Sequence, residues 1–475
     1  MEHGIKPRNI RSKIAHFFQP DGGLGYARIL RYFYPECITA LIIYFLPYCI
    51  DCYFICNLKS TNLYAISGIV DNFLTMFLKA AEGLSIGTVI VAGYHNGLKE
   101  YRKAGEAFVD AFWTVICVGA LVSIALYSTV SLVCKFNNFS PEMIEQGSPY
   151  LQAKSISIFF MFIYFALVGF LRAIKNTFVP MVVFAMGSVV FVLVDYLLIF
   201  GACGFPEMCL MGSAVASLAQ YLFMSIVMLL YVMYAKSHEQ YRLSFLTKNI
   251  SICRIKTLLW VSIPVVVDKV SIAFAYAWLG SCMSHLGATA GAAFSSIKLM
   301  ERFAFLPAIA LAQIITFLVS NDVGGGRWKD IHANIQRVLI MAMLMVGTIL
   351  IIGSIWPYIF VSLFDRKGEF GYLVARIFPV LSVLILIDLL QLILSAALRG
   401  AGDVRTVMIT RVCVIGGFFI PSTYLISFFC FHELVTKMMV TYGAFLLGNG
   451  LMSIVYVFRL RQNHWKRQKE KACND

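Results

Sequence analysis

Apolar residues occur in runs of about 20 along the whole chain, and short polar segments separate one run from the next. A run of this length lets an α-helix cross the hydrocarbon core of a bilayer. The pattern therefore predicts an all-α integral membrane protein with about twelve spans. A longer polar loop is expected at 135–148. We expect the spans at about 34–56, 66–94, 104–134, 149–171, 180–200, 212–234, 257–285, 294–319, 333–360, 372–398, 406–429 and 438–459.

Two polar turns of the first half recur in the second half at one fixed offset in residue number. Arg172 of LRAIKN falls on Arg399 of LRGAGD when the numbering is shifted by 399 − 172 = 227, and the same shift lays 97–102 on 324–329. One offset for two separated loops indicates an internal repeat of the kind found in transporters. We therefore expect two pseudo-symmetric six-helix bundles. The expected boundaries are a cytoplasmic tail at 1–33, an N-lobe at 34–234, a cytoplasmic linker at 235–256, a C-lobe at 257–460 and a basic tail at 461–475.

Composition agrees with a membrane protein, because 60% of the residues are hydrophobic, 13% are charged and the mean hydropathy is +0.79. In a soluble protein the net charge of +14 would suggest a nucleic-acid partner. In this chain most Lys and Arg lie in the two tails and in alternate loops, which is the positive-inside pattern. The pattern predicts a multi-pass protein of the cell membrane with both termini in the cytoplasm and no nucleic-acid partner. Residues 1–26 lack the apolar core of a cleavable signal sequence.

Three carboxylates stand in otherwise apolar spans: Asp51, Asp195 and Asp388. A charge at membrane depth costs about 3 kcal/mol or more, so each acid needs a neutralising partner, a bound cation or a proton. A buried carboxylate can carry a proton, and several oxygens together can hold sodium. Each acid could instead bond to a neighbouring helix for packing alone. Other polar residues expected near a cavity are Gln391, Asp268, Lys79, Glu82 and Glu301.

Lys79 and Glu82 stand three residues apart on one helix, so they could neutralise each other. The repeated polar turns predict a second group of functional residues at cytoplasmic hinges. These residues are Arg172, Arg399, Gly400, Gly402 and Asp403.

The sequence offers little for an enzyme or a metal centre. No phosphate loop or HExxH pattern is present, and the histidines fall in tails, loops or span ends. Cys49, Cys52 and Cys56 share a helix but have no fourth ligand nearby, so we expect no metal site. Cys203 and Cys209 flank a short outer loop, where a disulfide and two free thiols are both compatible with the sequence.

Several of these stretches together resemble the MATE (multidrug and toxic compound extrusion) family of the MOP flippase superfamily. The similar segments are PYCIDCYFICNLKSTNLYAISGI, GLSIGTVIVAGYHNGLKEYRKA, VLVDYLLIFG, MGSAVASLAQ and DLLQLILSAALRGAGD. The resemblance implies two six-helix bundles that face each other in a V around a central cavity. It also implies export of amphipathic, often cationic small molecules, driven by inward flow of protons or sodium and without another cofactor. We expect a monomer in the lipid bilayer.

By the same resemblance, Asp51 and Asp195 correspond to coupling acids of the N-lobe, and Asp388 to the acid of a C-lobe cation site. Two positions depart from the family pattern. Phe191 stands where the family often has asparagine, and Ile272 stands near the place of an expected glutamate. The second departure weakens the case for sodium near Asp388, so we predict coupling to protons at the N-lobe.

Two other classes of function stay open at this point. A flippase of lipid-linked saccharides, or an exporter of one metabolite from the same superfamily, would use cationic residues in the cavity. An integral membrane lipid-modifying enzyme would need a histidine or acid cluster at the membrane surface, which the sequence does not show. The candidate cations for the flippase are Lys79, Lys269, Lys298 and Arg302.

Overall fold

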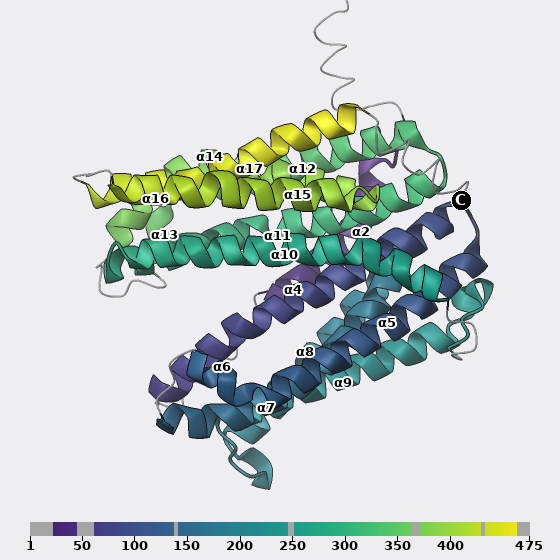
Figure 1. The fold of residues 1–475 in the computed structure, drawn as a ribbon, viewed down its shortest axis with the longest axis horizontal. Coiled ribbons are helices and arrows are strands. Elements are labelled where there is room, and N and C mark those ends of the chain that lie inside the picture. The colour runs from purple at the N-terminus through teal and green to yellow at the C-terminus, as the bar shows by residue number, and fades with distance from the viewer. Residues whose placement is uncertain are drawn as a thin grey trace, which may run out of the picture. The chain divides into compact units, whose positions relative to one another are not determined.

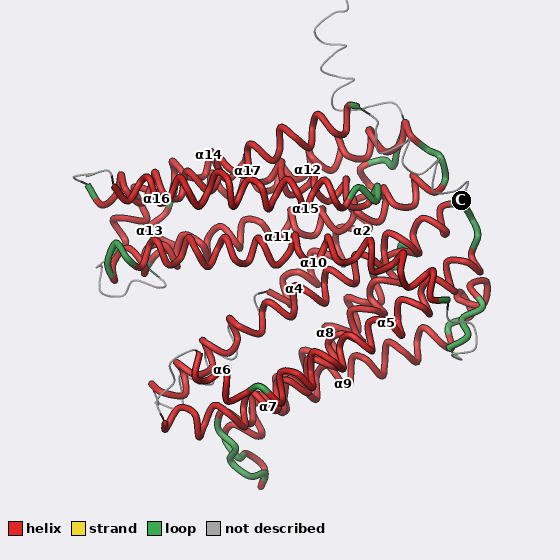
Figure 2. The backbone as a smooth tube through the Cα atoms, in the orientation of Figure 1, coloured by secondary structure: helices red, strands yellow, loops and turns green. Residues whose placement is uncertain are grey.

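The computed structural model describes residues 22–44, 61–136, 141–245, 251–362, 370–428 and 433–462. Every regular element in these ranges is helical (Figure 2). Among the described helices, eleven are long and apolar enough to cross a membrane. The all-α membrane fold expected from the hydrophobic pattern is confirmed. The twelfth expected span, at 34–56, lies partly in 45–60, outside the described residues.

The helices follow the predicted spans and extend beyond most of them. In the first half they are α2 (Tyr26–Tyr44), α4 (Thr61–Gly97), α5 (Tyr101–Ser128), α6 (Val130–Phe136), α7 (Pro141–Ala173), α8 (Phe178–Ile199), η1 (Ala202–Gly204), α9 (Leu210–Tyr234) and η2 (Lys236–Tyr241). In the second half they are α10 (Ile252–Ser284), α11 (Ala288–Gly324), α12 (Trp328–Ile355), α13 (Pro357–Val361), α14 (Gly371–Gly400), α15 (Val404–Val414), η4 (Ile415–Phe419), α16 (Ile420–Phe428) and α17 (Leu434–Arg461).

Two predictions about loops are wrong. The segment 135–148 is not one long loop, because α7 already begins at Pro141, and proline is favoured in the first turn of a helix. Arg172, Arg399 and Gly400 do not lie in loops either, since they form the last turns of α7 and α14. All three are buried there by tertiary contacts, which let the helix continue past the predicted end.

The offset of 227 between the two polar turns recurs in the ends of the helices. Adding 227 to the first and last residue numbers of α4, 61 and 97, gives 288 and 324, which are the ends of α11. The same sum for α5 converts 101 and 128 into 328 and 355, the ends of α12. The last residues of α7 and α9, 173 and 234, map onto 400 and 461, the last residues of α14 and α17. The repeat inferred from two loops therefore extends over the helices of both halves.

The turns that follow these helices repeat as well. Lys99 and Gly326 have φ of 62° and 67°, and Lys175 and Gly402 have φ of 65° and 83°. The members of each pair are separated by the same offset. A left-handed residue commonly ends a helix, and glycine adopts this conformation without a steric penalty. The second half thus has glycine where the first half holds a lysine in the same conformation.

A contact between an acidic and a basic side chain also recurs in the equivalent turns after α4 and α11. His95 Nδ1 lies 3.2 Å from Glu100 Oε2, and at the equivalent positions of the second half Asp322 Oδ1 accepts a hydrogen bond from Arg327 at 2.7 Å. Hydrogen bonds from Lys103 and His95 lower the pKa of the Glu100 carboxyl. The two positions are kept in the repeat, and the acidic and the basic residue change places.

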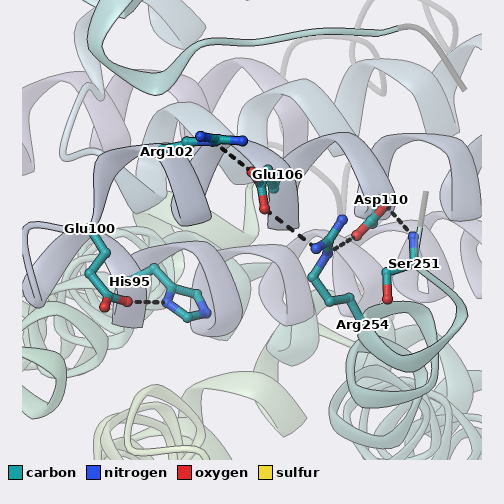
Figure 3. Close-up of polar contacts among 7 residues, drawn as sticks. All are labelled: His95, Glu100, Arg102, Glu106, Asp110, Ser251 and Arg254. Carbon is teal, nitrogen blue, oxygen red and sulfur yellow. Dashed lines mark hydrogen bonds and ion pairs between the residues drawn. The ribbon is translucent and has the colours of Figure 1, made fainter. Parts of the chain in front are cut away.

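A polar cluster anchors the chain that enters α10 to helix α5 (Figure 3). The backbone N–H of Ser251 donates to Asp110 Oδ1 at 3.3 Å, and the Arg254 guanidinium pairs with the same buried carboxylate. Arg254 also reaches Glu106, whose other oxygen accepts a hydrogen bond from Arg102 at 3.0 Å. The start of α10 is therefore held by charged side chains of α5.

The second half anchors the start of α2 at the equivalent place. Arg337 is the repeat equivalent of Asp110, and it donates to the carbonyl oxygens of Gly22 and Leu24 at 2.7 and 3.0 Å. Leu24 in turn is the repeat equivalent of Ser251. A carboxylate that accepts from the backbone in one half is thus replaced by a guanidinium that donates to the backbone in the other.

By its internal contacts the chain forms two compact units. The first is Met1–Phe33, Ala277–Ala401 and Cys413–Asp475, and its helix α14 packs against α11, α12 and α17 (Figure 1). The second is Tyr34–Tyr276 and Gly402–Val412, and its helix α7 packs against α4, α5 and α9. The lobe boundaries proposed from the repeat stay a prediction. The compact units divide the chain at other residues, and the first part of α10 packs in the same unit as α4.

Candidate functional site

Asp195 lies on the buried face of α8, one turn before the helix ends at Ile199. Its side chain is completely buried, so the carboxylate expected in the fifth span faces the protein interior. Phe191 occupies the same face one turn earlier and is also buried. Asp51, the other expected N-lobe acid, lies outside the described residues.

Lys154 is a buried cation of the same unit that the interpretation of the sequence missed. It lies on α7, its exposed fraction is 7%, and its Nζ donates to Ser217 Oγ on α9 at 2.9 Å. The ammonium also lies 5.3 Å from the centre of the Tyr150 ring. Lys154 could have been selected from the sequence. It is an ionisable residue within the apolar run 149–171, and the three aspartates were selected by the same criterion.

Two ion pairs lie toward the other end of this unit. Lys79 Nζ is 3.0 Å from Glu82 Oε2 on the same helix, as their spacing predicted. Arg172, expected in a loop, instead donates two hydrogen bonds to Glu36 of α2, at 2.8 and 2.6 Å. Both partners are buried, and the bidentate contact links the end of α7 to α2. A structural role therefore accounts for Arg172 more directly than a hinge in a loop.

In the first unit, Asp388 is buried on α14 and accepts a hydrogen bond from Asn449 Nδ2 of α17 at 2.8 Å. Gln391 lies on the same face of α14, three residues later, and is almost fully buried. Within the described residues, neither Gln391 Nε2 nor Asn449 Oδ1 has a hydrogen-bond partner. An acid and an amide thus meet between α14 and α17, and the amide, Asn449, was not identified from the sequence.

A second carboxylate, Glu301, extends this polar region. Glu301 is buried on α11 and accepts a hydrogen bond from the Tyr442 hydroxyl of α17. Tyr442 and Asn449 are seven residues apart, so they share one face of α17 and are separated by about 10 Å along its axis. Lys298, one turn before Glu301, lies 6.0 Å from the centre of the Phe294 ring. One face of α17 therefore contacts both carboxylates of this unit.

Asp268 was expected near a cavity, but its contacts are those of a structural ion pair. The Arg411 guanidinium of α15 donates to the Asp268 carboxylate, and both side chains are almost fully buried. Nearby, Arg405 stacks over the ring of Trp260 at 3.4 Å. Arg411, like Lys154, is an ionisable residue within a predicted span that was not selected, and the sequence gave no indication of its partner on another helix.

The predicted hinge after α14 consists of close packing and a short turn. Gly400 packs against the Thr316 carbonyl, where a Cβ atom would overlap the backbone of α11. Gly402 has a left-handed φ of 83°, and Asp403 Oδ1 accepts a hydrogen bond from Thr406 at 2.7 Å. Arg399 is buried in the last helical turn. In the other predicted turn, after α8, Cys203 and Cys209 are free thiols.

His238 of η2 is buried near the start of the segment between α9 and α10. Its ring makes edge contacts with Phe170, Tyr231 and Tyr241, and Nδ1 lies 3.1 Å from the Val232 carbonyl oxygen. Burial lowers the pKa of the imidazole, because the charged ring would lose its hydration. The folded chain therefore favours neutral His238.

Acid is expected to destabilise the wild-type protein partly through His238. The unfolded histidine has a pKa of about 6.5, so its stabilising contribution is present above about pH 6.5 and is lost as the pH falls through the lower folded-state pKa. The melting temperature measured between about pH 7.5 and pH 5.5 should fall less in His238→Phe than in the wild type. His285→Phe, at an exposed position, is the matched control. If the melting temperature of His238→Phe falls with pH as much as that of the wild type, the loss of stability in acid comes from other groups.

Comparisons with known proteins agree with the repeat and the fold. The MatE family model matches residues 37–197 and 264–425, two blocks whose first residue numbers differ by the repeat offset, 264 − 37 = 227. The probable multidrug resistance protein YoeA of Bacillus subtilis (strain 168) is 20% identical over 409 residues, which are 84% of this chain and 86% of that protein. The multidrug resistance protein MdtK of Yersinia pestis (strain Pestoides F) is 20% identical over 385 residues, 80% and 83% of the two chains.

A solved structure shares the fold over nearly the whole length. It is described as the outward-facing conformation of a multidrug resistance MATE family transporter of the MOP superfamily. The TM-score is 0.81 at 18% sequence identity, and the alignment covers 93% of this chain and 96% of that one. At this identity the likeness concerns the arrangement of the helices.

Proposed function

Because the chain belongs to the MatE family of membrane transporters, we propose that it exports amphipathic or cationic organic compounds in exchange for protons. The protein is a multi-pass membrane protein and an efflux transporter of this family, and it is not an enzyme. The observation that carries the proposal is the complete burial of the Asp195 carboxylate on a membrane-spanning helix. An ionisable group at this depth is costly and marks a path for ions or substrates.

The coupling step that we propose uses Asp195 together with Asp51. A proton that binds a carboxylate removes its charge, and export follows if proton and substrate prefer different conformations of the transporter. The proton would enter from outside, replace a bound organic cation and leave to the cytoplasm after the protein has changed its conformation. We place the transporter in the cell membrane with both termini in the cytoplasm. The proposed exchange uses residues of one chain, so a monomer is sufficient for transport.

Asp388 supports a second candidate for the coupling site. Its carboxylate and the unused Asn449 Oδ1 provide oxygen atoms of the kind that bind sodium. Asn449 stabilises the carboxylate without contributing a positive charge. Sodium as a co-transported ion at this place is therefore the alternative to protons at the N-lobe.

The test is efflux of a fluorescent organic cation from proteoliposomes under an imposed proton or sodium gradient. The wild type is compared with Asp51→Asn, Asp195→Asn and Asp388→Asn, and with Glu207→Gln as a control in an exposed loop. We expect the proton gradient to drive export, and Asp195→Asn to reduce the rate at least about tenfold, the effect of losing roughly 1.4 kcal/mol. If a sodium gradient drives export and only Asp388→Asn reduces it, the coupling site is at Asp388 in the first unit instead of at Asp195.

Lack of export under both gradients would contradict the proposed export of organic cations. The search would then turn to lipid-linked saccharides or to one specific metabolite. Among the cations suggested for a flippase, Lys79 is already paired with Glu82. This pairing favours organic compounds over phosphate-bearing lipids as the substrate.

A further inference from the structure

Arg405 and Trp260 form an exposed stack near the starts of α15 and α10. The Arg405 guanidinium lies 3.4 Å from the centre of the Trp260 ring, and the tryptophan is still 61% exposed. Lys256 is exposed one turn before Trp260, so it lies on the same side of α10 as the stack. Among the described residues, no acid pairs with Lys256 or Arg405. Two cations and an indole ring thus share one outer surface.

Two contacts show that α10 and α15 run side by side in the same direction. Arg405 meets Trp260 near the first turns, and Arg411 pairs with Asp268 further along both helices. The steps between these contacts are 268 − 260 = 8 residues on α10 and 411 − 405 = 6 residues on α15, or about 12 and 9 Å. Each helix also buries a valine in one cluster with α4, so a different side of each helix faces outward.

Apolar side chains continue this outer surface beyond the cations. On α10, Ile263 and Val267 are exposed three and seven residues after Trp260. On α15, Ile409 and Val412 are exposed four and seven residues after the stacked arginine. Spacings of three, four and seven residues stay on one face of a helix. The two helices therefore present two cations followed by an apolar face.

The level of the cations matches the interface between a membrane and water. The spans expected from the sequence begin at 257 and 406, directly after Lys256 and Arg405. Both helices belong to segments long and apolar enough to cross a bilayer. Tryptophan is enriched at membrane interfaces, and long cationic side chains extend toward them. At this level the cations meet lipid headgroups, and the apolar face beyond them meets acyl chains.

We propose that the starts of α10 and α15 bind the headgroup of an acidic phospholipid through Arg405 and Lys256. The N–H groups of a guanidinium point outward in its plane, so Arg405 can stack on Trp260 and still donate to two oxygens of one phosphate. Lys256 adds a second positive charge, which repels the choline group of a zwitterionic lipid. Because we place the linker before α10 in the cytoplasm, the lipid belongs to the cytoplasmic leaflet, whose surface is negative. Such a site does not depend on which compound the protein exports.

The test is native mass spectrometry of the purified, delipidated full chain in detergent. Phosphatidylglycerol and phosphatidylcholine with the same acyl chains are titrated separately, and the ratio of their apparent affinities is measured. We expect the wild type to prefer phosphatidylglycerol, and the double variant Lys256→Gln with Arg405→Gln to lower this preference at least about tenfold. Equal binding of the two lipids by the wild type would overturn the proposal.

Lys236→Gln with Arg242→Gln is the matched control for loss of charge. Both residues are exposed, in η2 and directly after it, on the side of the membrane where we place the linker. The change removes two positive charges, as the test variant does, so the control should keep the wild-type preference. The same loss in both double variants would assign the preference to the overall charge of the protein and overturn the site.

Arg405→Lys distinguishes a phosphate site from simple attraction between charges. Lysine keeps the positive charge and loses the planar group that stacks on the indole and binds two oxygens. The preference for phosphatidylglycerol should fall about threefold in Arg405→Lys and in Trp260→Leu, since the stack no longer orients the guanidinium. An unchanged preference in both variants would overturn the role of the stack.

Glycerol phosphate distinguishes a lipid from a soluble anion as the occupant. It carries a similar headgroup without acyl chains, so it makes no contact with Ile263 or Ile409. As its ammonium salt, at the same concentration as the lipid, it should leave phosphatidylglycerol bound to the wild type. Displacement of the lipid would overturn the assignment and indicate a site for soluble phosphates.

Discussion

Arg411→Met is expected to lower the free energy of unfolding by about 3 to 5 kcal/mol. The change removes the guanidinium that pairs with the Asp268 carboxylate, and that carboxylate stays in the interior. Loss of one partner leaves a desolvated charge, which costs more than the intact pair contributes. Equilibrium unfolding of the purified protein in mixed micelles measures the effect.

The double variant Asp268→Leu with Arg411→Met separates the cost of a lone charge from loss of packing. Two apolar side chains can fill a similar volume, so this variant is expected to lie within about 1.5 kcal/mol of the wild type. Arg405→Met, whose guanidinium stacks on the exposed Trp260, serves as the control and should cost less than about 1 kcal/mol. If the double variant loses as much free energy of unfolding as Arg411→Met, the ion pair is needed for more than charge balance.

The sequence predicted those features of the fold that depend on neighbouring residues. Apolar runs located the spans, and two polar turns gave the offset of 227 that the helix ends repeat. Errors arose at helix ends, as at Pro141 and Arg172, because tertiary contacts decide where the last turn stops. The partner of Arg172 is Glu36, 136 residues earlier, and no local pattern indicates it.

The polar sites were predicted only in part for the same reason. Asp388 and Gln391 share one helix and could be grouped by spacing, whereas Asn449 is 61 residues from Asp388 and stands in an apolar helix. Tyr442 lies 141 residues from Glu301 and looks like an ordinary aromatic residue of a span. Lys154 could have been found, because its charge alone sets it apart from the apolar run that contains it.

The repeat covers the scaffold but not these polar sites. Adding 227 to 195 gives Ser422, and adding 227 to 154 gives Leu381. Subtracting 227 from 388 and 301 gives Met161 and Leu74. The helix ends and anchoring contacts are therefore common to both halves, while these four buried charges have no charged equivalent in the other half. This asymmetry favours different tasks for the two lobes, such as coupling in one and a second ion or substrate contact in the other.

Gly87→Val is expected to abolish transport while the protein still folds. Within the second unit, Gly87 and Gly83 of α4 face α10, and a Cβ atom on Gly87 would overlap Ser262 Oγ. At Gly83 a Cβ atom would lie 2.9 Å from Val266 Cγ2. Small residues at four-residue spacing allow two membrane helices to approach closely. Helix α4 belongs to the first repeat and α10 to the second, so this contact must loosen if the repeats move against each other.

A valine at Gly87 should hold α4 and α10 apart and favour the conformation in which their contact is broken. Initial rates of dye export from proteoliposomes measure the loss, which should exceed about 100-fold if the closed contact is needed in each cycle. Gly347→Val, where a Cβ atom would have open space, is the control and should keep the wild-type rate. The accessibility of Ser262→Cys to a membrane-impermeant maleimide, in a background without other cysteines, should rise in Gly87→Val. Export at more than half the wild-type rate would show that α4 and α10 need not close on each other during transport.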